Sequence, residues 1–200
     1  MIMLAVDPGL DGVGGAFFDV RQFRLSSRSP VEAIKSWVGT FNLTTDPKDP
    51  LPHRLGELSL EIADLINCLR PEERPRLIYI EEPSYTGDYQ KGRKNRNEVN
   101  RLYMAIGALI AGVHASEPVR RPGPHYVRPL LYLVPADRTR KGSRINSLES
   151  IAHIAGRKLP TGPRGGVTGV IADQRDAIYI GWSCLLSRVE KDLTLRGGEE

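Results

Sequence analysis

The sequence has little of what marks secreted, disulfide-bonded or membrane-spanning proteins. Its 200 residues include only two cysteines, Cys68 and Cys184, and each lies in an apolar helical pattern that favours a buried free thiol. No apolar run approaches the roughly 18–20 residues that cross a bilayer. No basic stretch precedes the strand-like segment from Met1 to Val6, so we expect no secretory signal and no membrane partner. The expected location is the cytoplasm, either of a bacterial cell or of a host cell if the protein is viral.

Aromatic residues are also scarce, at 6% of the chain, and the apolar fraction of 40% is ordinary for a globular protein. The length fits one domain with a sizeable core. We expect this domain to span residues 1–194, followed by a frayed tail over residues 195–200. The net charge of +4 permits a polyanionic partner but does not require one.

The first residues predict a β-hairpin. Met1 to Asp7 has the composition of a buried strand, Pro8 to Gly12 is rich in turn residues, and Val13 to Val20 gives a second strand. The segment from Arg21 to Phe41 has no clear pattern and could contain a third strand. A loop rich in proline and aspartate follows.

Helices and strands alternate after this hairpin. Apolar residues recur at helical spacing from His53 to Leu69, and the last helix is expected from Ile171 to Val189. The elements predicted between them are a strand Arg76–Ile80, a helix Leu102–Ala115, a strand Leu130–Val134, a basic loop Ala136–Arg144 and a helix Ser147–Ile154. This alternation favours an α/β fold in which helices cover a mixed sheet.

Four acidic residues stand at the ends of these elements. Asp7 closes the first strand, and Glu81 closes the strand after the first long helix. Asp173 and Asp176 open the last helix three residues apart, so they share one helical face. Carboxylates gathered from distant segments repel each other unless cations neutralise them, and Mg²⁺ prefers oxygen ligands. Two such ions about 3.5–4 Å apart can activate a water and stabilise the leaving oxygen of a phosphodiester.

Each acid, taken alone, also has a structural explanation. Asp7 precedes a Pro-Gly pair and could serve only to favour a turn. Asp173 suits a helix N-cap, and Asp176 suits the first turn of a helix, where negative charge is favourable. Glu81 could be a solvated charge at a strand end.

The joint pattern of three motifs resembles the RuvC family of Holliday-junction resolvases, within the RNase H-like superfamily. Leu4 to Gly9 (LAVDPG) followed by a second strand resembles the family's opening, and Tyr79-Ile80-Glu81 resembles its second acidic motif. Asp173 to Ala177 (DQRDA) resembles its closing Asp-x-x-Asp-Ala motif at a helix start. Order and approximate spacing agree across nearly the whole chain. The resemblance implies an RNase H-like α/β fold: a mixed five-stranded sheet with an N-terminal antiparallel hairpin and helices on both faces.

The resemblance also implies that these four acids are the catalytic, metal-binding carboxylates. Asp7 would lie between two Mg²⁺ or Mn²⁺ ions, Glu81 would bind one of them, and Asp173 with Asp176 would hold the other.

Two further acids, Glu82 and Asp11, lie close in sequence to the motif residues. Glu82 directly follows Glu81, and strand alternation directs the two side chains to opposite faces. Glu81 fits the motif better, because it comes directly after the apolar strand. Asp11 lies shortly after Asp7, where a role in the hairpin turn is expected rather than metal ligation.

Two basic clusters follow strands that we place in the same sheet as the acids. A basic run is usually a solvated surface, but beside such a site these groups would contact phosphates without reading bases. The lysine common at the start of the family's penultimate helix is absent, and Arg144 or Asn146 stands in its place. Tyr85 is a candidate for stacking on unstacked bases, with Tyr89 or a plain loop role as alternatives. The candidate DNA-binding residues are Tyr85, Lys91, Arg93, Lys94, Arg96, Arg138, Arg140, Lys141 and Arg144, with Arg101 at the end of the first cluster.

The function implied is structure-selective, metal-dependent cleavage of four-way DNA junctions in recombination and repair. A dimer would make paired symmetric nicks that leave 5′-phosphate and 3′-hydroxyl ends, since a two-fold protein suits a two-fold branch. The small-residue helix Leu102–Ala115 could form the dimer interface or could pack within the chain.

Other functions fit some of the same features. A related RNase H-like nuclease would act on flaps, forks or RNA–DNA hybrids with the same acids. A non-catalytic DNA-binding module would have no need of all four acidic residues. An actin-like ATPase or sugar kinase would need two such domains and a second phosphate loop, for which the chain is too short.

Overall fold

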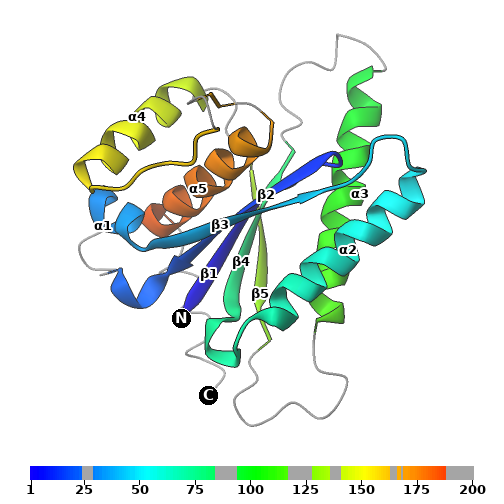
Figure 1. Cartoon of the computed structure of the whole chain (residues 1–200), viewed down its shortest axis with the longest axis horizontal. Helices are drawn as coiled ribbons and strands as arrows, with labels where there is room; N and C mark the ends of the chain where they lie inside the picture. The colour runs from blue at the N-terminus through cyan, green and yellow to red at the C-terminus, as the bar shows by residue number, and fades with distance from the viewer. Residues whose placement is uncertain are drawn as a thin grey trace.

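The computed structural model describes residues 1–23, 29–83, 94–116, 128–135, 141–162, 166–167 and 169–187. Within these ranges five strands form one sheet in the order β3-β2-β1-β4-β5 (Figure 1). The strands are β1 Ile2–Asp7, β2 Gly12–Asp19, β3 Trp37–Thr44, β4 Pro75–Glu82 and β5 Leu130–Pro135. The helices are α1 Pro30–Lys35, α2 Leu51–Cys68, α3 Lys94–Ala115, α4 Lys141–Ile154 and α5 Val170–Ser187, with short 3-10 turns η1 Val20–Gln22 and η2 Pro71–Glu73.

The predicted N-terminal hairpin and mixed sheet are confirmed. β1 pairs antiparallel with β2, with Asp7 opposite Gly14, and β2 pairs antiparallel with β3. β4 pairs parallel with both β1 and β5. Because parallel strands point the same way, β1, β4 and β5 all end at one edge of the sheet, which we call the carboxyl edge.

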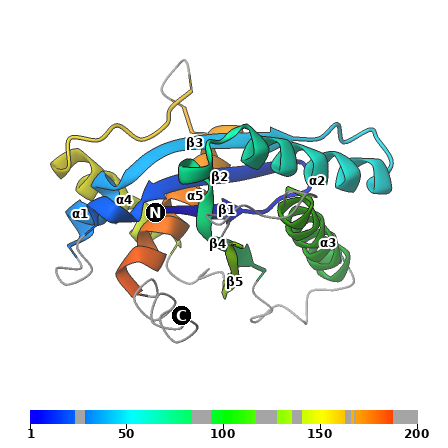
Figure 2. The ribbon, with the colours of Figure 1, turned by 90° about the horizontal axis from the view of Figure 1, so that it is seen from below.

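Helices cover both faces of the sheet, as predicted (Figures 1 and 2). Met3, Ala5, Leu77 and Tyr79 belong to a core shared with α1, α4 and α5. The residues between them in β1 and β4, such as Val6, belong to a second core shared with α2 and α3. The alternation of side chains along a strand therefore defines an α5 face and an α2 face.

The α2 face is closed by two helices in close contact. Leu58, Ile62 and Ile66 form the buried stripe of α2, which the helical spacing of apolar residues predicts. Gly112 of α3 packs against α2, since a Cβ atom at this position would lie 2.2 Å from the carbonyl oxygen of Ser59. The small-residue part of α3 was a candidate dimer interface. Gly112, at least, packs against α2 within the chain.

The structure corrects several sequence predictions. α3 begins at Lys94 instead of Leu102, and α4 begins at Lys141, so that 141–144 is helical and not part of a loop. Apolar periodicity does not reveal such polar helical turns, although Lys and Arg are good helix formers. The structure contains a third strand, β3, which runs from Trp37 to Thr44. The sequence pattern from Arg21 to Phe41 did not decide whether such a strand forms.

The two cysteines differ in environment. Cys184 is buried, as predicted, whereas Cys68 is exposed. Cys68 is the last residue of α2 and comes two residues after the buried Ile66, so the helical turn directs it away from the core. In the described part of the chain, no helix combines enough length and apolar character to cross a membrane.

Candidate metal site at the carboxyl edge

Asp7 and Glu81 lie on the same face of neighbouring strands. Asp7 ends β1, and strand alternation places its side chain with Met3 and Ala5 on the α5 face. The pairing of Val6 with Ile80 sets Glu81 beside the end of β1, on the face that Leu77 and Tyr79 occupy. Adjacent strands are about 4.8 Å apart, so two carboxylates project side by side from the carboxyl edge.

Glu82 projects to the opposite face. The Tyr103 hydroxyl of α3 donates a hydrogen bond of 2.9 Å to Glu82 Oε1, and α3 covers the α2 face. The geometry therefore favours Glu81 over Glu82 as the partner of Asp7.

Asp173 reaches the same edge from above the sheet. A Cβ atom on Gly14 would lie 2.1 Å from the backbone oxygen of Asp173, and one on Gly12 would lie 2.9 Å from its carboxylate Oδ2. Only glycine at position 14 lets the first turn of α5 approach β2 this closely. Since Gly14 pairs with Asp7, Asp173 lies over the strand neighbour of Asp7.

The start of α5 is held in place by a buried arginine. Arg175 Nε donates to the carbonyl oxygen of Pro160 at 2.8 Å, and its Nη1 donates to Glu149 Oε1 of α4 at 2.5 Å. The helix begins at Val170 with Asp173 in its first turn, so the N-cap explanation of Asp173 is wrong. Asp176 follows one turn later and is half-buried.

A second buried arginine holds the turn that follows Asp7. Arg54 of α2 is 7% exposed, contacts the carboxylate of Asp11, and donates from Nε to Thr45 Oγ1 at 2.9 Å. The Thr45 hydroxyl in turn donates to the carbonyl oxygen of Leu10 at 2.7 Å. Asp11 therefore acts in the hairpin turn, as predicted, and fixes the loop that leaves Asp7.

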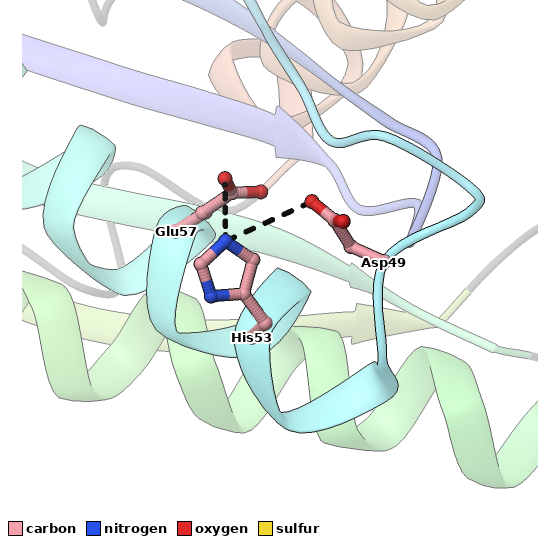
Figure 3. Close-up of side chains that lie close together, drawn as sticks. All are labelled: Asp49, His53 and Glu57. Atoms are coloured by element: carbon pink, nitrogen blue, oxygen red, sulfur yellow. Dashed lines mark ion pairs between the residues drawn. The ribbon is translucent and has the colours of Figure 1, made fainter.

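A separate group of acidic residues and a histidine lies at the start of α2 (Figure 3). The ligand atoms of Asp49, His53 and Glu57 lie within 4.8 Å of one another, and among the described residues no other three such side chains do so. His53 Nε2 is 3.7 Å from Asp49 Oδ2 and 3.2 Å from Glu57 Oε1. His53 and Glu57 are four residues apart on α2, a spacing that brings side chains together on a helix surface, and Asp49 lies just before the helix. We therefore assign this group to surface ion pairing.

Another carboxylate lies at the far end of the sheet. Asp19 ends β2 opposite Ile2 and accepts bonds of 2.9 and 2.8 Å from the Arg21 guanidinium. Hydrogen bonding from Arg21 lowers the pKa of Asp19 to about 2. Its charge is neutralised within the fold by the Arg21 guanidinium.

The donor set at the carboxyl edge suits a hard divalent cation. Asp7, Glu81 and Asp173 offer only carboxylate oxygens, the ligands that Mg²⁺ prefers. Gly12 carries no side chain beside the Asp173 carboxylate, and a Cβ atom there would lie 2.9 Å from Asp173 Oδ2. The types of these residues fit the metal that the resemblance implies, and in this structure the ligand atoms of the three do not all lie within 4.8 Å of one another.

Most of the predicted DNA-contacting side chains are not among those that the structure describes. Tyr85, Tyr89, Lys91, Arg93, Arg138 and Arg140 lie outside the described residues. Lys94 and Arg96 belong to α3, and Lys141 and Arg144 belong to α4. The structure describes the backbone of these four residues but not their side chains. Arg101 of α3 is exposed.

Sequence reasoning missed two polar residues near the carboxyl edge. Arg54 stands four residues before Leu58, in phase with the buried stripe of α2, and that phase could have indicated a buried arginine. Asn42 of β3 gives no comparable signal, because one asparagine in a half-exposed strand is unremarkable in sequence.

Comparison of the sequence with protein-family models and with curated proteins gives no match. Among solved structures, RuvC from T. thermophilus in complex with a Holliday junction substrate matches with a TM-score of 0.59 at 14% identity, over 93% of each chain. The chain has the fold of the RuvC resolvases. A second Thermus thermophilus RuvC structure gives a TM-score of 0.57 at 14% identity, over 93% of this chain and 94% of that one.

The same fold extends to a eukaryotic protein. The yeast mitochondrial Holliday junction resolvase Ydc2 matches with a TM-score of 0.53 at 14% identity, over 96% of this chain and 85% of that one. The predicted RNase H-like fold is therefore confirmed. The RuvC-like order of β1, β2, β4 and α5 brings Asp7, Glu81 and Asp173 to one edge.

Proposed function

We propose that this protein is a metal-dependent endonuclease that resolves four-way DNA junctions. One observation carries the proposal: in a RuvC fold, Asp7 and Glu81 share the α5 face at the carboxyl edge, and Asp173 packs over Gly14 beside them. These three acids come from distant segments of the chain, and a bound divalent cation would offset the repulsion between clustered carboxylates.

The acids at the carboxyl edge have different roles in metal binding. Asp7 lies between Glu81 on one side and Asp173 on the other, so it is the carboxylate that two ions would share. Asp176, one helical turn after Asp173, completes the set. These carboxylates would hold Mg²⁺ or Mn²⁺, which would supply an activated water and charge stabilisation for the leaving oxygen.

The remaining parts of the proposal concern DNA and assembly. β4 and β5 both end at the carboxyl edge, and the two basic clusters follow them in sequence. Their charges would hold phosphates beside the acids without reading bases. A homodimer would present two such sites to the two-fold branch of a junction, and the paired nicks would serve recombination or repair in the cytoplasm.

A panel of substrates tests the proposed function. A synthetic four-way junction, a flap, a linear duplex and an RNA–DNA hybrid of matched sequence are incubated with Mg²⁺ or with EDTA. We expect two opposing strands of the junction to be nicked at least about tenfold faster than any other substrate, and only with Mg²⁺. Cleavage of the hybrid but not the junction would refute the resolvase function, and cleavage in EDTA would refute the metal mechanism.

A further inference from the structure

Asn42 lies in the same row of residues as the acids. It pairs with Gly14 across β2 and β3, and Gly14 pairs with Asp7 across β1 and β2. Directly paired residues project to the same face of a sheet, so the side chains of Asn42 and Asp7 both lie on the α5 face. Only the bare Gly14 stands between them.

The amide of Asn42 also lies close to Asp173. From the point where a Cβ atom on Gly12 would stand, Asp173 Oδ2 is 2.9 Å away and Asn42 Nδ2 is 3.9 Å away. The amide nitrogen and the carboxylate oxygen therefore border the same small space above Gly12.

Both polar atoms of this amide are buried without a hydrogen-bond partner. In the described part of the chain, Asn42 Nδ2 and Oδ1 are the buried side-chain atoms in this condition. Leaving such groups unpaired destabilises a fold, and most buried polar groups in proteins are satisfied. A leucine of similar size would avoid this cost, so the fold alone does not account for an asparagine.

We propose that Asn42 is a positioning residue for Asp173. When the site is loaded, its Nδ2 donates a hydrogen bond to the Asp173 carboxylate and holds it toward the ion, while Oδ1 accepts from a water of the site. The inference rests on the proposed function and adds a residue to it. Partners that orient a metal ligand typically change metal affinity or activity by about 10–100-fold when removed.

The variant Asn42→Leu separates a positioning role from a structural one. Without metal, we expect its melting temperature to equal or exceed that of the wild type, because the unpaired amide is gone. The Mn²⁺ concentration that gives half of the metal-induced rise in melting temperature should increase about tenfold. Junction nicking at fixed Mn²⁺ should fall by about 10–100-fold.

Two further variants sharpen the test. Asn42→Ser also removes the amide and should shift the Mn²⁺ midpoint in the same direction, even if the leucine variant fails to fold. Thr40→Val, two residues earlier on the same face of β3, should leave the midpoint unchanged. If neither Asn42 variant moves the Mn²⁺ midpoint by more than about twofold, the inference is wrong. If the wild type itself neither binds Mn²⁺ nor nicks junctions, the proposed function fails instead.

Discussion

Asp7→Asn is expected to abolish Mg²⁺-dependent nicking of a four-way junction while leaving junction binding intact. Asparagine keeps the shape of the side chain but removes the charge that two ions would share. Loss of several kcal/mol of charge stabilisation corresponds to a rate at least about 1000-fold lower, since each 1.36 kcal/mol is tenfold. Single-turnover nicking and gel-shift binding in Ca²⁺ measure the two effects separately. Binding should be unchanged or tighter, because a negative charge near DNA has been removed.

Asp11→Asn is the matched control for this prediction. Asp11 lies four residues after Asp7, and its carboxylate contacts Arg54 in the hairpin turn. The amide oxygen of asparagine still accepts a hydrogen bond from the guanidinium, so the nicking rate should fall only a few-fold. A normal nicking rate for Asp7→Asn would contradict the metal site. Equal losses in both variants would show that the turn, and not the charge at Asp7, controls the rate.

Gly14→Ala is expected to have the largest effect on folding. The added methyl group would lie 2.1 Å from the backbone oxygen of Asp173 and 2.8 Å from the backbone nitrogen of Gln174. Backbone atoms at a helix start cannot rotate away as a side chain can, so α5 must shift from the sheet. Overpacking of this kind costs about 1–3 kcal/mol or more, and it moves Asp173 away from Asp7. Urea denaturation should show the loss, and the remaining folded protein should nick junctions slowly.

Two other glycines provide graded controls. A Cβ atom on Gly39 would meet nothing within 4 Å, so Gly39→Ala in the neighbouring strand should leave stability equal or slightly higher. A Cβ atom on Gly12 would be closest to the Asp173 carboxylate, 2.9 Å from Oδ2, and this side-chain end can rotate. Gly12→Ala should therefore fold nearly normally and lose activity. Wild-type stability of Gly14→Ala would contradict the close approach of α5 to β2.

The sequence was informative wherever a pattern repeated or a motif stood at an element end. The hairpin, the stripe of Leu58, Ile62 and Ile66, and the positions of Asp7 and Glu81 at strand ends followed from composition and periodicity. The RuvC-like order of motifs then predicted the sheet, and the fold agrees with it. Such features depend on neighbouring residues in the chain, which a sequence displays directly.

What the sequence could not reveal are contacts between distant segments. The approach of Asp173 to Gly14 joins residues from α5 and β2, and no local pattern records it. The same is true of Asn42, whose significance comes from its pairing with Gly14. For Glu81 and Glu82 the sequence favours Glu81, because it directly follows the apolar strand. The strand register and the Tyr103–Glu82 hydrogen bond supply the physical reason, since they assign the two side chains to opposite faces.

The two adjacent glutamates test most directly whether the acids on the α5 face of the carboxyl edge form the nuclease site. Glu81→Gln and Glu82→Gln are compared with the wild type in single-turnover nicking of a four-way junction across a Mg²⁺ titration. Glu81→Gln should lose at least about 100-fold in rate. Glu82→Gln, which can still accept the bond from Tyr103, should stay within about threefold. A reversed order, or equal rates for both variants, would show that the site does not lie on the α5 face.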